Sequence, residues 1–515
     1  MLVSTLSGKV QGFEKDGAVQ FRGVPYAAPP TGQLRFKAPA PTVPWDDVLD
    51  CTAHRASATQ DVGGMEAFLG GSGSRIPTSE DCLYLNVFTP AADDAARPVM
   101  VWIHGGAFVS GSGSVPWYNG ARLAVGGDVV VVTINYRLGA WGFLHLEHLL
   151  GDAFAGSGNN GILDQVAALE WVRDNIAAFG GDPSKVTIFG ESAGGMSVGT
   201  LLGLPAAKGL FKGAIAQSGA ARNVLKREAA EANALVLLEH VGLDAAHARD
   251  LLEVPTDRLL EAQQAMVGTN TSFDTATTSG LALRLVPVVD DIVVPEAPIK
   301  AVSNGSADGV AVLTGTTHDE CTLFLLMAQA SGDLPDGKLE ARCERIFGAG
   351  RGREAVERYR SAAATAAGSA GSNGDVWCAV LTDQVFRLPS IRLAETLAAR
   401  GQSDTWMYRF DQPSKAFGGA LRACHAVEIP FVFDNLHRRG VEQFIGPVTD
   451  EVQALARAMS RAWLAFAHHG DPNHEGLPDW PRYDAEQRAT MLFDTPAALA
   501  HDPDGPTREL WAELI

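Results

Sequence analysis

The first half of the chain alternates short apolar runs with segments of helical periodicity. Two runs rich in β-branched residues, Val99–His104 and Val129–Asn135, end at glycine or turn residues and predict buried strands. Apolar residues at three- and four-residue spacing predict an amphipathic helix over Gly161–Phe179. A Gly-Gly-Asp-Pro sequence ends this helix, and a third strand is predicted at Lys185–Phe189. Strands that alternate with helices indicate the α/β class, with a mainly parallel central sheet flanked by helices.

The second half contains further strands and two helix-rich segments. Strands are predicted at Val310–Gly315 and Thr405–Phe410. Residues 222–283 are rich in Ala, Leu and Glu, and residues 332–374 have a similar character with additional Gly and Ser. No long low-complexity linker divides the chain. We therefore expect a single domain over residues 1–515, in which these two segments are helical insertions that form a cap over a functional site.

Composition and charge narrow the possible partners. Of the 515 residues, 46% are hydrophobic and 20% are charged, which is ordinary for a soluble globular protein. A formal net charge of −19 disfavours nucleic acid and anionic membranes as partners, because like charges repel. The apolar runs are too short to span a bilayer, and the N-terminus lacks the pattern of a signal peptide. We expect a cytoplasmic protein without membrane insertion; its oligomeric state stays open.

Six cysteines are scattered along the chain without a CxxC pair or the spacing of metal ligands. Free cysteines are among the most buried residues of folded proteins, where they behave as small apolar side chains. The sequence therefore predicts buried, reduced thiols. The cysteines are Cys51, Cys82, Cys321, Cys343, Cys378 and Cys424.

The strongest chemical signal is the sequence Gly-Glu-Ser-Ala-Gly at residues 190–194. A serine hydroxyl becomes a nucleophile when a base takes its proton and its oxygen is held exposed. A sharp turn from strand to helix exposes the oxygen, and flanking glycines permit the tight backbone. Residues 195–199 match the same pattern, but Ser197 lacks a preceding strand and falls inside a helix predicted at Ser197–Leu204. Ser192 is therefore the candidate nucleophile, and a plain glycine-rich turn is the alternative.

Longer motifs on both sides of this turn carry a family resemblance. They are Phe21–Ala27 (FRGVPYA), Ser79–Val87 (SEDCLYLNV), Asn135–Gly139 (NYRLG) and Phe179–Gly195. With these motifs the sequence resembles the type-B carboxylesterase/lipase family over almost its whole length, in the style of the bacterial para-nitrobenzyl-esterase-like branch. The resemblance implies an α/β-hydrolase fold and the hydrolysis of carboxylic esters.

The resemblance also implies an oxyanion hole. The strand Val99–His104 runs into a His-Gly-Gly loop, the placement expected for backbone N–H groups that stabilise a developing oxyanion. By this resemblance the donors are Gly106, Ala107 and Ala193. Ala107 stands where many relatives carry a third glycine.

An acid and a base are expected downstream of the nucleophile, because this fold orders its triad as Ser, then Asp or Glu, then His. The strand Val310–Gly315 leads into Thr-Thr-His-Asp-Glu, where the resemblance implies Glu320 as the acid. Asp319 is the alternative, and its simpler interpretation is a turn or capping residue. His425, in the loop after the strand Thr405–Phe410, matches the family's base segment. Cys321 replaces the family's usual glycine next to the acid.

Two residues are predicted as possible supports of the triad: Ser218, which matches a serine found behind the triad in some family members, and Glu191. In the predicted mechanism, His425 takes the proton of Ser192 while Glu320 orients the imidazole, and water later resolves an acyl-enzyme. The mechanism needs no metal or cofactor, and its substrate is a small-molecule ester. Activity is expected to decline as pH falls through the pKa of the base, about 6.5 when unperturbed.

Two other interpretations differ in function. A lipase acting on longer-chain lipid esters would call for a large apolar lid, and the predicted cap contains no long apolar stretch. A non-catalytic binding relative would lack a member of the triad, whereas Ser192, Glu320 and His425 are all present. The sequence therefore favours a serine carboxylesterase.

Overall fold

The structure is a computed structural model that describes residues 1–61, 77–268, 283–328, 334–367 and 371–512. Within these ranges the central sheet has 11 strands. Along the chain they are β3 (Phe13–Lys15), β4 (Ala18–Pro25), β8 (Tyr84–Thr89), β9 (Arg97–Ile103), β10 (Val130–Ile134), β11 (Gly181–Glu191), β12 (Gly213–Gln217), β15 (Ala311–Thr317), β16 (Thr405–Phe410), β17 (Ala489–Phe493) and β18 (Ala498–His501).

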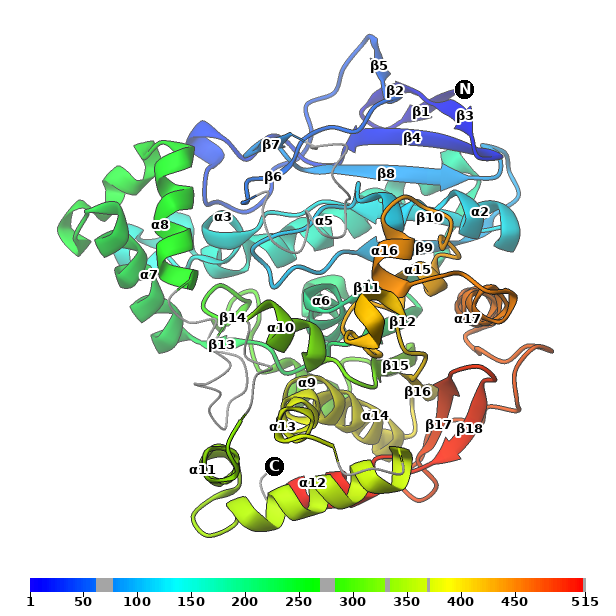
Figure 1. The fold of residues 1–515 in the computed structure, drawn as a ribbon. Helices are drawn as coiled ribbons and strands as arrows, with labels where there is room; N and C mark the ends of the chain where they lie inside the picture. The colour runs from blue at the N-terminus through cyan, green and yellow to red at the C-terminus, as the bar shows by residue number, and fades with distance from the viewer. Residues whose placement is uncertain (62–76, 269–282, 329–333, 368–370, 513–515) are drawn as a thin grey trace.

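The strands are arranged in the order β18-β17-β16-β15-β12-β11-β9-β10-β8-β4-β3 (Figure 1). From β17 to β10 neighbouring strands pair in parallel, and the strands at the two edges pair antiparallel. All five strands predicted from the apolar runs are present, as β9, β10, β11, β15 and β16. The mainly parallel sheet expected from the sequence is therefore confirmed.

Two predicted helices are also present, and one begins earlier than expected. The periodic segment forms α5 (Asn160–Asn175) and a short 3₁₀ turn, η5 (Ile176–Phe179). The helix expected from Ser197 is α6 (Ala193–Leu202), which begins directly after Ser192. Its earlier start follows from the sharp turn at Ser192, after which the chain is helical at once.

Successive side chains of β9 enter two different apolar cores, as the alternation of a strand requires. Val99, Val101 and Ile103 belong to one core, and Met100 and Trp102 to the other. The first core includes residues of α5, α6 and α14 (Leu388–Arg400), and the second includes residues of α2 (Ala121–Gly127) and α17 (Asp450–His469). Helices thus cover both faces of the sheet (Figure 1).

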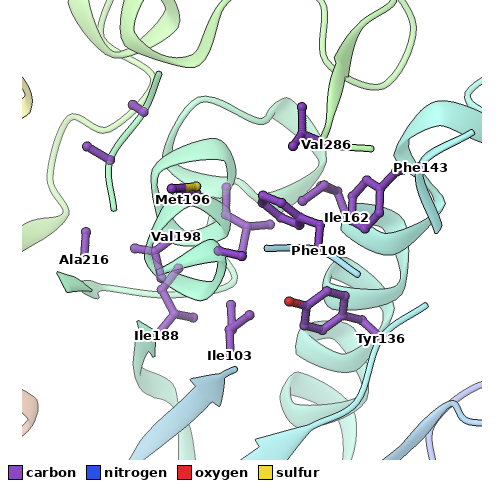
Figure 2. Packing of buried hydrophobic residues seen from close by; sticks show 14 of the residues in the cluster. Ile103, Phe108, Tyr136, Phe143, Ile162, Ile188, Met196, Val198, Ala216 and Val286 are labelled. Atoms are coloured by element: carbon purple, nitrogen blue, oxygen red, sulfur yellow. The ribbon is translucent and has the colours of Figure 1, made fainter. Parts of the chain in front are cut away.

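Helix α6 is fixed to the sheet by apolar packing. Met196 and Val198 of this helix lie in the same buried cluster as Ile188 of β11 and Ile103 of β9 (Figure 2). All four side chains are at most 3% exposed. This packing sets the direction of α6 and therefore the position of the turn that precedes it.

The two segments predicted as insertions contain helices. Within residues 222–283 the structure has α7 (Arg227–Val241), η7 (Ala245–Glu253) and α8 (Thr256–Gly268). Within residues 332–374 it has α11 (Asp336–Phe347), α12 (Gly352–Ala367) and the start of α13 (Asn373–Thr382). Residues 269–282, 332–333 and 368–370 of these segments lie outside the described residues. The single domain and the covering of a site by these helices stay predictions.

The six cysteines are free and buried, which confirms the expected buried thiols. In the part of the chain that the structure describes, no helix combines the length and apolarity needed to cross a bilayer.

Candidate active site

Ser192 lies at the turn between β11 and α6. Its backbone has φ 59° and ψ −123°, a positive-φ conformation that is rare for a residue with a side chain. The turn is held on both sides, because the N–H of Ser192 donates to the Gln217 carbonyl (2.9 Å) and the N–H of Met196 donates to the Ser192 carbonyl (2.8 Å). Strained backbone of this kind persists where the surrounding structure determines it, and it is concentrated at functional sites.

The glycines of the pentapeptide permit a close approach to the end of β9. A Cβ atom on Gly190 would lie 2.6 Å from the carbonyl oxygen of Ile103, and one on Gly194 would clash with the same oxygen. In the loop that follows β9, a Cβ atom on Gly105 would lie 3.0 Å from Cβ of Ser192. The predicted His-Gly-Gly loop therefore lies directly against the serine turn.

This loop presents backbone N–H groups. Gly106, Ala107 and Phe108 have φ values of 110°, 55° and 62°, and the Gly106 carbonyl accepts from the N–H groups of Val109 and Ser110, both at 3.0 Å. Among the described residues, the N–H groups of Gly106 and Ala107 donate no hydrogen bond. The N–H of Ala193 belongs to the first turn of α6, where N–H groups lack a partner within the helix. The three predicted donors are thus near one another and near Ser192.

The predicted acid and base are in direct contact. Nδ1 of His425 lies 2.6 Å from Oε2 of Glu320, and both side chains are buried. Glu320 follows β15 and precedes α10 (Cys321–Met327), and its other oxygen accepts from the N–H of Thr317 at 2.8 Å. The carboxylate is therefore held from two sides, in the position from which an acid orients an imidazole.

The alternative acid, Asp319, points elsewhere. Its Oδ2 atom lies 3.1 Å from Nδ1 of His318 and accepts from the N–H of Ala423. Of the two neighbouring carboxylates, Glu320 is the one that contacts His425.

The second ring nitrogen of His425 faces Glu191. Nε2 lies 3.1 Å from Oε1 of Glu191, whose side chain is buried. The described residues show no hydrogen bond between the Ser192 hydroxyl and His425. Such bonds are often long or misaligned in the free enzyme and tighten when substrate binds. The rings of Phe324 and Phe386 pack against the imidazole, with centroids 4.9 and 4.8 Å away.

A further buried carboxyl, Glu428, was not found from the sequence. Its Oε1 atom accepts hydrogen bonds from Gln217 Nε2 and Tyr408 Oη, both at 2.9 Å. Gln217 is the residue whose carbonyl holds the Ser192 turn, so Glu428 is connected to the site through side chain and backbone. The sequence signal that could have suggested Glu428 as a site residue is its position three residues after His425.

Burial and neighbouring charges shift the pKa values of Glu191, Glu428 and His425. Burial raises the pKa of Glu191 to about 7 and that of Glu428 to about 8. Burial by itself lowers the pKa of His425, but the negative charges of Glu191 and Glu320 outweigh it and raise that pKa to about 9. The pKa of His425 therefore lies above the unperturbed histidine value of about 6.5, since these carboxylates favour the charged imidazole.

Ser218 directly follows Gln217 at the end of β12. Its N–H donates to the Gly315 carbonyl at 2.8 Å, its φ is 48°, and its buried hydroxyl has no hydrogen-bond partner among the described residues. Its role behind the triad stays a prediction.

These features define the class of the protein, which is that of the α/β-hydrolase-fold enzymes. They are the mainly parallel sheet, the strand–serine–helix turn, the His–Glu pair and the loop of free N–H groups. Comparison with known proteins gives the family. The sequence model described as "Carboxylesterase family" matches residues 1–511, so the chain belongs to the carboxylesterase family.

Individual relatives agree with this assignment. The chain is 41% identical to para-nitrobenzyl esterase of Bacillus subtilis (strain 168), covering 99% of this chain and 98% of that protein. It is 36% identical to phenmedipham hydrolase of Pseudarthrobacter oxydans, with 97% of each chain covered. The crystal structure of the Geobacillus stearothermophilus carboxylesterase EST55 superposes with a TM-score of 0.87 at 41% identity, covering 99% of each chain. The predicted fold and family are confirmed, and the protein is a carboxylic ester hydrolase.

Proposed function

We propose that this protein hydrolyses small carboxylic esters through an acyl-enzyme on Ser192, with His425 as base and Glu320 as the orienting acid. The observation that carries the proposal is the buried 2.6 Å contact between His425 Nδ1 and Glu320 Oε2, next to the strained turn at Ser192. A carboxylate at Nδ1 leaves Nε2 as the nitrogen that can accept a proton.

In the first half-reaction, the hydroxyl oxygen of Ser192 attacks the ester carbonyl carbon while its proton passes to Nε2 of His425. The carbonyl oxygen becomes an oxyanion, which accepts hydrogen bonds from the backbone N–H groups of Gly106, Ala107 and Ala193. The tetrahedral intermediate then breaks its bond to the alcohol oxygen, which takes the proton from His425. The alcohol leaves and an acyl-serine remains.

In the second half-reaction, water attacks the acyl-serine and gives its proton to the same nitrogen of His425. Collapse of the second intermediate returns the proton to the oxygen of Ser192 and releases the carboxylic acid. Glu320 stays ionised throughout and stabilises the charged imidazole. No metal or cofactor enters any step.

Glu191 contributes a second negative charge on the opposite side of the imidazole, 3.1 Å from Nε2. This charge stabilises the imidazolium that forms in both half-reactions, but it also retains a proton on His425 in the free enzyme. Because the base has to be neutral before it can act, we expect kcat/KM to fall with decreasing pH already above the ordinary histidine range.

The most direct substrates to test are p-nitrophenyl acetate and butyrate, together with a para-nitrobenzyl ester in view of the name of the B. subtilis relative. His425→Ala is expected to lower kcat/KM by about a thousandfold or more while circular dichroism stays native. His468→Ala is the matched control, because His468 is an exposed histidine on α17. Equal activity of the two variants would overturn the assignment of the base.

The same assay distinguishes the lipase alternative. A carboxylesterase prefers short soluble esters, whereas a lipase gains activity on long-chain esters once they form an emulsion. We expect the rate to decline with increasing acyl length and to show no increase at the solubility limit. A rise at that limit would favour the lipase.

A further inference from the structure

Two histidines and a glutamate that take no part in the catalytic proposal lie together in the structure. His145 follows α3 (Gly139–Phe143), His148 belongs to α4 (Glu147–Leu150), and Glu231 belongs to α7. One ring nitrogen of each histidine and one carboxylate oxygen all lie within 4.8 Å of one another. His145 is buried, Glu231 is half-buried and His148 is exposed, so the cluster is open to solvent on one side.

His145 is unusual because it is buried without partners. The residue is 1% exposed, and neither ring nitrogen has a hydrogen-bond partner among the described residues. Leaving a buried polar group unsatisfied is costly, and most such groups in folded proteins have a partner. The ring is stacked on that of His148, with centroids 5.8 Å apart and planes 7° apart. A ligand shared by the two rings would give His145 the missing partner.

The charges around the cluster favour a cation. Arg227 is the nearby positive group, and it pairs with Glu147 at 3.6 Å and with Asp291 at 3.1 Å. Glu231 forms no ion pair with any described residue. Its carboxylate is therefore available to a cation, and the positive charge of Arg227 is already balanced by two other carboxylates.

We propose that His145, His148 and Glu231 bind a divalent transition-metal cation of the Zn²⁺ type. Imidazole nitrogens and a carboxylate oxygen are typical zinc ligands, while Mg²⁺ and Ca²⁺ prefer oxygen alone. Zinc bonds of about 2.0–2.1 Å call for ligand atoms about 3.3 Å apart in a tetrahedral site. The exposed ring of His148 and the half-buried Glu231 can rotate to close the present spacing, and water takes the fourth position.

The site connects two parts of the chain that are far apart in sequence. The histidines adjoin the α3–α4 segment, and the glutamate comes from α7 in the helix-rich segment 222–283. A bound metal therefore cross-links α7 to the α/β core and stabilises the folded state by the free energy of binding. This role is independent of ester hydrolysis.

The test is a titration of the chelator-treated full chain with ZnCl₂, followed by competition with a chromophoric chelator. We expect one tight equivalent in the native protein, weakened at least about tenfold in His148→Ala and in Glu231→Gln. Both side chains reach solvent, so these variants are expected to fold. His240→Ala is the matched control, because His240 is an exposed histidine of α7 outside the cluster, and it should bind zinc as the native chain does.

Two further readouts separate this site from the triad and from surface histidines. The tight equivalent should persist in His425→Ala, which removes the imidazole of the triad. Zinc should raise the melting temperature of the native chain and of His240→Ala, but not that of His148→Ala. The proposal is overturned if the native chain shows no equivalent tighter than about 1 mM, or if His148→Ala and Glu231→Gln both bind as tightly as the native protein.

Discussion

Two serines five residues apart occupy the same Gly-x-Ser-x-Gly pattern and have different structures. Ser192 is the turn between β11 and α6, with positive φ, and it lies against the His-Gly-Gly loop. Ser197 lies inside α6, fully buried, and its hydroxyl accepts a hydrogen bond from Gln165 Nε2 at 3.0 Å. The difference shows that the preceding strand, rather than the pentapeptide itself, gives Ser192 its strained and only half-buried position.

The neighbouring carboxylates Asp319 and Glu320 repeat this lesson. Both follow β15, but only Glu320 contacts His425, while Asp319 pairs with His318. In each pair, the two residues look equivalent in sequence, but their side chains point in different directions and make different contacts. Substituting the two members of each pair one at a time, and comparing the two variants, is therefore the sharpest way to test the proposed catalytic roles.

The largest effect is expected at the two serines. Ser192→Ala removes the proposed nucleophile and should lower kcat/KM for p-nitrophenyl butyrate by about a thousandfold or more. Ser197→Ala removes one buried hydrogen bond and should leave activity within about twofold, at a cost of about 1 kcal/mol in stability. Rates for purified proteins of matched circular dichroism decide the comparison, which fails if the two variants lose similar activity.

A smaller but still large effect is expected at the two carboxylates. Glu320→Gln keeps the shape of the side chain but removes the charge that we propose orients His425 and stabilises its protonated form. We expect a loss of about a hundredfold to ten-thousandfold in kcat. Asp319→Asn should lower kcat by less than about tenfold, because it affects a contact with His318 and not one with His425. A larger loss of kcat in Asp319→Asn than in Glu320→Gln would contradict this assignment and indicate that Asp319 is the acid.

The smallest effect is expected at Glu191, and it appears in the pH dependence. Glu191 is one of the charges that raise the pKa of His425, so its removal should lower that pKa. The acid limb of kcat/KM in Glu191→Gln is therefore expected to move toward lower pH, by about one pH unit. Ser197→Ala serves as the control with an unshifted profile. A limb that stays in place, or moves toward higher pH, would contradict the electrostatic account.

Local sequence patterns were sufficient to predict the strands around the candidate site and the motifs that it contains. The apolar runs predicted β9, β10, β11, β15 and β16, and the strand before residues 190–194 distinguished Ser192 from Ser197. The resemblance to the family supplied the residues of the proposed acid and base, which lie 105 positions apart. The contact between the two side chains depends on the fold, because the fold brings the ends of parallel strands to one edge of the sheet.

Contacts between buried polar side chains were not predictable in the same way. Glu428 accepts a hydrogen bond from Gln217, which lies 211 residues away in the sequence, and no local sequence pattern predicts such a pair. Glu191 was a candidate by its place in the pentapeptide, but its position at Nε2 of His425 depends on how the loop around His425 folds over β11. The cluster of His145, His148 and Glu231 was missed for the same reason, since its third member lies on a distant helix.

The central claim is that Ser192 is the residue that becomes acylated. The most direct measurement is mass spectrometry of peptides after reaction with diethyl p-nitrophenyl phosphate, which transfers a stable phosphoryl group to an activated serine. We predict one adduct per chain, on the peptide that contains residues 190–194 and at Ser192, with no adduct in Ser192→Ala. An adduct at Ser197 or elsewhere, or equal labelling of Ser192→Ala, would contradict the account.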